Sequence, residues 1–194
     1  MKFDYGGDAD SLYDGQGQRK YLHQKEVRRL LAAAERGDSV TNLFCQVLYY
    51  AGCRLSEALE LTPRRLDVET CCIIFRTLKR RKLTFRHVPV PKPLLTALLA
   101  HADGRDPHAL LFPWCRQTGW RRIKALMDAA AISGPQATPK GLRHQFGCRG
   151  VSNQVPESSV GKWLGHANPK STHVYTAVTG DEAQALAKRM WRAR

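Results

Sequence analysis

Apolar residues recur along most of this chain at the spacing of amphipathic helices. From Val40 to Ala51 they stand at i, i+3, i+4, i+7, i+8 and i+11, which places them on one face of a helix that Gly52 ends. Further stripes and capping signals predict helices over 24–36, 55–61, 94–100, 120–130, from 139 onward, about 156–164, from 168 and over 181–192.

One segment has a different pattern. Residues 71–76 and 83–90 are rich in Ile, Phe, Thr and Val, and the basic run Lys79-Arg80-Arg81-Lys82 lies between them. This pattern predicts a β-hairpin with a basic tip, which Pro91 and Pro93 end. The predicted fold is therefore mainly α with a small antiparallel β-sheet, an α+β arrangement.

The predicted domain organisation is simple. Residues 1–20, which begin with a stretch rich in Gly, Asp and Gln, are predicted to form a flexible N-terminal arm. Residues 21–194 are predicted to form a single domain, because no repeat or linker divides them and 194 residues suffice for one hydrophobic core.

The charge of the chain indicates a polyanionic partner. Lys and Arg number 31 against 17 Asp and Glu, and nucleic acid is the usual partner of a net charge of +14. Charge alone leaves open a basic protein without a particular partner. Six cysteines without CxxC spacing argue against a zinc site and suit a reducing cytosol. No signal peptide or membrane-spanning run is visible, so we expect a cytoplasmic location without a membrane partner.

Two arginines stand where their side chains can reach a phosphate. Arg54 follows a helix break, and Arg143 lies in the first turns of a later helix. Arginine stays charged and contacts phosphate in a bidentate way, so the two are predicted to clamp one phosphate and stabilise its negative charge. Lys140 shares a helix face with Arg143, and His144 beside them is predicted to contact DNA.

The candidate nucleophile is Tyr175, in a short helix near the C-terminus. A phenol ionises near pH 10, more easily than serine, and neighbouring arginines favour the ionised form. His166, in the loop after a helix-ending glycine, is predicted to hydrogen-bond a phosphate oxygen. Lys140 is predicted to donate to a phosphate or to help accept the tyrosine proton.

The basic hairpin tip is predicted to serve the leaving group. A sugar hydroxyl that leaves phosphorus needs a proton, and Lys79 is the best-placed donor. The neighbours that are predicted to contact backbone phosphates are Arg80, Arg81 and Lys82.

Each of these residues alone is more often structural. A buried tyrosine usually belongs to the core, an arginine at a helix start usually lies on the surface, and Lys140 with Arg143 equally fits a solvated helix face. The joint order of the set, with nine residues from His166 to Tyr175, favours a functional reading.

The segments that carry this set resemble the sequence boxes of the tyrosine recombinase (phage integrase) family, over about residues 21–190. They are Ala51-Gly52-Cys53-Arg54-Leu55-Ser56-Glu57-Ala58, Lys140-Gly141-Leu142-Arg143-His144, Leu164-Gly165-His166 and Ser171-Thr172-His173-Val174-Tyr175-Thr176. The resemblance implies the fold of the family's catalytic domain. It adds Glu57 as a buried supporting residue and leaves Lys82 as the alternative to Lys79. It also places Lys140 where the family usually has histidine.

The resemblance further implies a site-specific recombinase. Tyr175 would attack the scissile phosphate and form a 3′-phosphotyrosyl link, and strand exchange would pass through a Holliday junction. The implied partners are double-stranded DNA and three further copies of the chain in a tetramer on two DNA sites, with accessory proteins in some systems. Neither ATP nor a metal ion is implied, because the covalent link stores the bond energy.

Alternatives remain open at this stage. The chain resembles short, single-domain recombinases that invert DNA segments, such as fimbrial promoters, but an isolated catalytic fragment of a longer integrase fits as well. Cleavage and rejoining of one strand, as in type IB topoisomerases, uses similar residues. A non-catalytic DNA-binding module descended from a recombinase is a third hypothesis. The C-terminal segment 181–194 is predicted either to dock on a neighbouring subunit or to form a basic closing helix.

Overall fold

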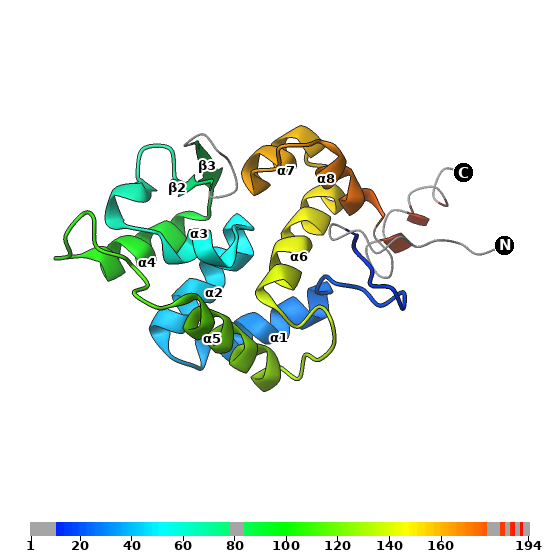
Figure 1. Ribbon diagram of the computed structural model, residues 1–194, viewed down its shortest axis with the longest axis horizontal. Helices are drawn as coiled ribbons and strands as arrows, with labels where there is room; N and C mark the ends of the chain where they lie inside the picture. Colours follow the sequence, from blue (N-terminus) through cyan, green and yellow to red (C-terminus); the bar gives the residue numbers. More distant parts are fainter. Residues whose placement is uncertain (1–10, 78–83, 178–182, 185–186, 189–190, 192–194) are drawn as a thin grey trace.

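The computed structural model describes residues 11–77 and 84–177, together with 183–184, 187–188 and 191 (Figure 1). Its elements are α1 (Gln24–Glu35), α2 (Ser39–Ala51), α3 (Leu55–Leu59), the 3₁₀ turn η1 (Pro63–Arg65), β1 (Leu66–Asp67), β2 (Cys72–Arg76), β3 (Phe85–Pro89), α4 (Lys92–Ala102), α5 (Arg116–Ala129), α6 (Pro139–Ser152), α7 (Glu157–Leu164), α8 (Lys170–His173) and the 3₁₀ turn η2 (Val174–Thr176). The predicted class, mainly α with a small antiparallel sheet, is confirmed.

Helix α2 lies at the centre of the larger hydrophobic cluster. The Asp38 side chain caps its N-terminus by accepting a hydrogen bond from the Thr41 backbone N–H at 2.9 Å. Gly52 ends the helix in the left-handed conformation, with φ of 58°. The apolar stripe predicted from the sequence is buried except for the half-buried Val40, and α2 packs against α1, α4, α5 and α6.

The sheet has the strand order β1–β2–β3, and both pairings are antiparallel. Ile73 pairs with Val88 in the predicted hairpin, and both side chains are fully buried. The sequence did not predict β1, a strand of two residues that is too short to show alternation. The predicted basic tip, Lys79 to Lys82, lies outside the described residues.

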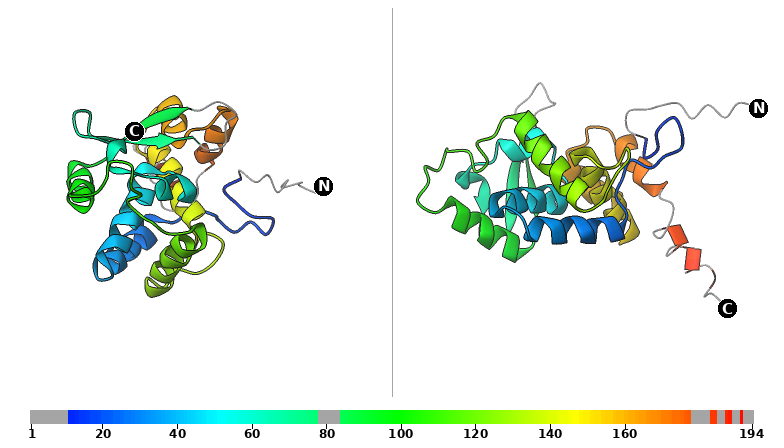
Figure 2. Two further views of the ribbon diagram at one scale, coloured as in Figure 1. Left: turned by 60° about the vertical axis from the view of Figure 1, so that its left-hand side comes forward. Right: turned by 90° about the horizontal axis from the view of Figure 1, so that it is seen from below.

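The C-terminal elements surround the far end of α6. Figure 1 shows α7 and α8 over the C-terminal end of α6, and Figure 2 shows α7 beside the sheet, where it contacts β3. A smaller hydrophobic cluster lies here; its buried members are Leu12, Tyr21, Phe146, Cys148, Val160, Leu164 and Tyr175. Helix α6 joins both clusters, since Leu142 belongs to the larger one.

Part of the predicted N-terminal arm packs on the domain. Leu12 is 2% exposed, and Tyr13 pairs with Arg19 in an isolated antiparallel bridge. Packing therefore begins earlier than Tyr21, because Leu12 belongs to the smaller cluster and the Tyr13 hydroxyl donates to the Ala177 carbonyl at 3.2 Å. Residues 1–10 lie outside the described part of the chain. Of the predicted C-terminal helix, the few described positions are helical, and the rest lies outside as well.

Among the described residues, no helix combines the length and the apolar character that crossing a membrane requires.

Candidate active site

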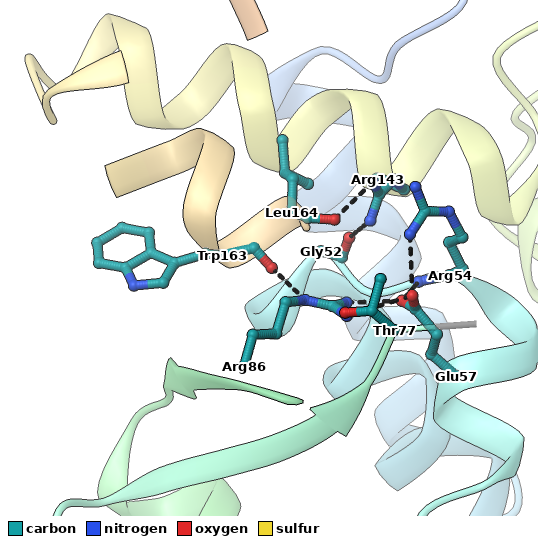
Figure 3. Close-up of polar contacts among 8 residues, drawn as sticks. All are labelled: Gly52, Arg54, Glu57, Thr77, Arg86, Arg143, Trp163 and Leu164. Carbon is teal, nitrogen blue, oxygen red and sulfur yellow. Dashed lines mark hydrogen bonds and ion pairs between the residues drawn. The ribbon is translucent and has the colours of Figure 1, made fainter. Parts of the chain in front are cut away.

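Arg143 is buried at the centre of the candidate site. It lies one turn into α6, whose start is fixed by Pro139 and by the Thr138 hydroxyl, which accepts from the Gly141 N–H at 3.1 Å. Its Nη1 donates to the Gly52 carbonyl and its Nη2 to the Leu164 carbonyl, both at 2.8 Å (Figure 3).

The surroundings of Arg143 affect its charge but leave it cationic. Burial, and after it the positive charge of Arg54, lowers the pKa of the Arg143 guanidinium to about 10. Tyr175 and Glu57 act in the opposite direction. At neutral pH the guanidinium therefore remains charged, in a setting with little water to screen it.

Arg54 lies in the turn between α2 and α3, next to Arg143 (Figure 3). Glu57 fixes it twice: the carboxylate accepts from the Arg54 backbone N–H at 2.7 Å and from its Nη1 at 2.9 Å. The backbone contact is one half of a capping box at the start of α3. A quarter of the Arg54 side chain stays exposed, so it can still reach a ligand.

Glu57 is a buried carboxylate between two arginines. It is 2% exposed and accepts from Arg86 Nη2 at 2.6 Å and from Arg86 Nη1 at 3.2 Å. Burial works against the charged form, but the hydrogen bonds and positive charge of Arg86, with those of Arg54, outweigh it and hold the pKa below its ordinary value. Glu57 is thus buried, as expected from the family resemblance, and ionised.

Tyr175 lies against two histidines. Its ring, on η2, is nearly parallel to the ring of His166, with centroids 6.1 Å apart, and is tilted against that of His144 at 5.9 Å. A hydrogen bond of 2.9 Å joins His166 Nδ1 and Thr172 Oγ1, which ties the loop after α7 to α8. The Tyr175 side chain is buried, so the predicted nucleophile is also a core residue.

The structure gathers part of the set predicted from the sequence. Arg54, Arg143, His166, Tyr175 and His144 meet between α3, α6, α7 and η2. Lys140 is exposed at the start of α6, although Arg143 one turn later is buried, so the predicted common face does not give them a common environment. The hairpin residues Lys79, Arg80, Arg81 and Lys82 lie outside the described residues.

Sequence reasoning missed Arg86, a buried arginine of β3. Besides Glu57, it contacts the Trp163 carbonyl, to which its Nε donates at 2.8 Å, and the Thr77 hydroxyl at 3.3 Å. The signal was present in the strand alternation. Arg86 and Val88 occupy the inward positions of β3, so the pattern placed a charged residue toward the interior.

Comparison with known proteins now identifies the class. Residues 20–182 match the sequence model of the phage integrase family, so the chain belongs to this family. It is 33% identical over 170 residues to tyrosine recombinase XerA of Thermococcus onnurineus. The aligned region covers 82% of this chain and 58% of that protein.

Solved structures agree on the fold. A crystal structure of XerA recombinase matches with a TM-score of 0.75 and 26% identity, over 90% of this chain and 65% of that one. The site-specific recombinase XerH, bound to its difH substrate, matches with a TM-score of 0.67 and 16% identity, over 94% and 60%. The fold is therefore that of a tyrosine recombinase catalytic domain. The chain spans about three fifths of the length of its curated relatives.

Proposed function

We propose that this chain is the catalytic domain of a tyrosine site-specific recombinase, which cleaves and rejoins DNA strands. The observation that carries the proposal is the meeting of two arginines and a tyrosine from distant segments. Arg143 interacts electrostatically with both Arg54 and Tyr175. A phosphodiester placed between the guanidinium groups would have its negative charge stabilised next to a phenol oxygen.

The proposed chemistry is an in-line displacement at phosphorus. The Tyr175 phenol gives up its proton to water and its oxygen attacks, so a P–O bond to tyrosine forms while the P–O bond to the 5′-oxygen breaks. Arg54 and Arg143 bind the non-bridging oxygens, and His166 hydrogen-bonds one of them. The 5′-oxygen takes a proton from a hairpin lysine, Lys79 or Lys82.

The phosphotyrosyl link makes the cleavage reversible. The number of phosphoester bonds does not change, so the 5′-hydroxyl of a partner strand can attack the link without an external energy source such as ATP. One pair of such exchanges would form a Holliday junction, and a second pair would resolve it. We propose that four copies act on two DNA sites, an arrangement that gives each of the four strands one nucleophile. Whether recombination inverts, integrates or excises DNA depends on the sites.

Two features support DNA as the substrate. The net charge of +14 suits a phosphate backbone, and binding should weaken steeply with salt because each phosphate contact releases counterions. XerH, which shares this fold, is bound to difH. Lys140 occupies the position where the family usually has histidine. At the exposed start of α6 it would donate a hydrogen bond to a DNA phosphate.

The test is a covalent-trapping assay with a nicked, labelled duplex taken from the DNA that flanks the gene. In such a substrate the released fragment diffuses away, so the adduct accumulates. We expect a denaturant-resistant protein–DNA adduct with the parent and none with Tyr175→Phe, which should still bind the duplex. Tyr50→Phe, which removes the hydroxyl of a half-buried tyrosine elsewhere, is the matched control and should form the adduct normally.

The outcomes separate the hypotheses. An adduct with Tyr175→Phe would mean that another residue is the nucleophile. Tight binding without an adduct from the parent would favour a non-catalytic DNA-binding module. Exchange between two sites, rather than relaxation of one supercoiled circle, would distinguish a recombinase from a type IB topoisomerase.

A further inference from the structure

His166 follows the C-terminal end of α7, and the last four carbonyls of this helix all accept hydrogen bonds. Gly165, with φ of 68°, allows the His166 N–H to donate to the Gly161 carbonyl at 3.0 Å and its own N–H to donate to the Lys162 carbonyl at 3.1 Å. Helix ends also leave later carbonyls without partners. Here the next two carbonyls, of Trp163 and Leu164, each accept from an arginine at 2.8 Å.

These two arginines come from different parts of the chain. Leu164 is bound by Arg143, a member of the candidate site, but Trp163 is bound by Arg86 of β3, 77 residues away in sequence. Arg86 also packs tightly beneath the turn. A Cβ on Gly165 would come within 3.2 Å of Arg86 Cδ and Nε, a tight contact, so glycine favours this close approach as well as the left-handed backbone conformation.

The other end of the Arg86 guanidinium reaches the opposite side of the site. Its two terminal nitrogens bind both oxygens of Glu57, and the same carboxylate binds the backbone and side chain of Arg54. A single planar group therefore connects β3 with the Arg54 turn and with the end of α7 (Figure 3). It lies in the wall of a cleft of about 690 Å³ between the hairpin and α7–α8, whose lining includes His166.

We propose that Arg86 is a positioning residue for strand cleavage, which sets the places of Arg54, through Glu57, and of His166, through the end of α7. Arg86 belongs to β3, a strand of the hairpin whose tip is predicted to carry the catalytic lysine. Through its contacts it would therefore also hold this hairpin in place relative to the phosphate-binding side chains. This inference rests on the proposed function for its consequence in catalysis, but the positioning itself can be measured without DNA.

The chemistry of the position requires arginine. Three nitrogens of one plane donate in two directions, to a carboxylate on one side and to a backbone carbonyl on the other. Lysine offers a single nitrogen, so it can keep the charge next to Glu57 or reach Trp163, but it cannot reproduce the bridge. Methionine fills part of the volume and makes neither contact.

The first arm of the experiment measures single-turnover cleavage and DNA binding for Arg86→Met and Arg86→Lys. For Arg86→Met we expect the cleavage rate at saturating protein to fall at least about tenfold, while half-saturation stays within about threefold, because misplaced groups cost rate more than affinity. Arg86→Lys should lie between Arg86→Met and the parent. Arg122→Met is the matched control. Like Arg86, Arg122 pairs with a carboxylate, that of Asp38, and lies over an aromatic ring, that of Trp114. Among the described interactions, Arg122 makes no hydrogen bond or ion pair with α3 or α7.

The second arm measures the imidazole NMR signals of His166 in histidine-labelled protein without DNA, assigned by comparison with His166→Asn. We expect the signals to shift in both Arg86 variants and to stay in place in Arg122→Met. This readout decides the positioning even if the parent forms no adduct, a result that would count against the proposed function alone.

The proposal is overturned by a folded Arg86→Met protein that cleaves at the parental rate, or by unmoved His166 signals. Should Arg86→Met fail to fold, Arg86→Lys decides: full cleavage with unmoved signals would show that only the charge of Arg86 matters.

Discussion

The two hydrophobic clusters of this domain are built in different ways. The larger cluster consists mainly of side chains from amphipathic helices, joined by residues of the sheet and of loops. It includes aromatic rings in edge contact: the ring centroid of Phe44 lies 4.9 Å from that of Phe112 and 5.3 Å from that of Trp114. The smaller cluster gathers residues from distant segments and includes Tyr175. In the first, the apolar side chains stabilise the fold. In the second, one of the packed side chains is also the proposed nucleophile.

This difference indicates where stability and activity can be separated. Loss of volume in the larger cluster lowers the free energy of unfolding but leaves the site geometry in those molecules that remain folded. A small change of shape in the smaller cluster moves the tyrosine itself. The two clusters meet at α6, which contributes Leu142 to one and Phe146 to the other.

The largest expected effect is on stability, from Phe44→Ala. Phe44 is fully buried, and removing its ring leaves a cavity, so we expect the free energy of unfolding to fall by about 3–5 kcal/mol. Urea unfolding measures this loss. Cleavage per folded molecule should stay near the parental rate, and the control Val68→Ala, at an exposed side chain, should change little. A large loss of cleavage among folded Phe44→Ala molecules would show that the clusters are coupled.

The next effect is on activity, from Gly147→Ala. A Cβ at Gly147 would lie 2.5 Å from two carbons of the Tyr175 ring, so the ring or α6 must move. We expect adduct formation to fall by about 10- to 100-fold, since an ångström of misplacement has consequences of this size.

The matched control for this substitution is Gly119→Ala in the larger cluster. Gly119 lies within α5, and its nearest neighbour would be a Leu59 methyl group at 3.3 Å, which can shift. Alanine also favours helix more than glycine does, so this variant should be about as stable as the parent and fully active. Equal cleavage by the two glycine variants would contradict the proposed distinction between the clusters.

Periodicity along the sequence predicted the helical members of the larger cluster and its hairpin. The stripe from Val40 to Ala51 and the hairpin around Ile73 were found from the sequence, because each element buries one regular face. Helix α6 was found through its cap at Thr138 and Pro139 rather than through a stripe, since its residues from Gly141 to Cys148 are all buried.

The polar part of the site was less accessible to this reasoning. Periodicity reports which face of an element is buried, but the partners of a buried charge are set by contacts across the fold. Arg143 binds a carbonyl 91 residues away, and Arg86 binds Glu57 at a separation of 29. The family resemblance supplied Glu57 but not Arg86. Neither the resemblance nor the periodicity indicated that both terminal nitrogens of Arg143 bind backbone carbonyls.

The smallest effect is the pH dependence that Glu57→Gln should remove. The pKa of Glu57 lies below its ordinary value of 4.5 in the folded protein, so its ionised form stabilises the fold above that pH. This contribution is lost as the pH falls from about 4.5 through the lower folded value. Glu57→Gln should therefore cost about 2 kcal/mol at pH 7, where charged hydrogen bonds to two arginines are weakened, and progressively less below pH 4.5.

Glu26→Gln provides the comparison that ties this prediction to the site. Glu26, near the start of α1, also has a lowered pKa: its hydrogen bonds, chiefly from Arg19, outweigh the effect of burial. Its variant should show the same sign of pH dependence in urea unfolding. Cleavage should fall only in Glu57→Gln, because Glu57 alone of the two holds Arg54. A pH-independent difference between Glu57→Gln and the parent would mean that Glu57 is not held ionised by its arginines.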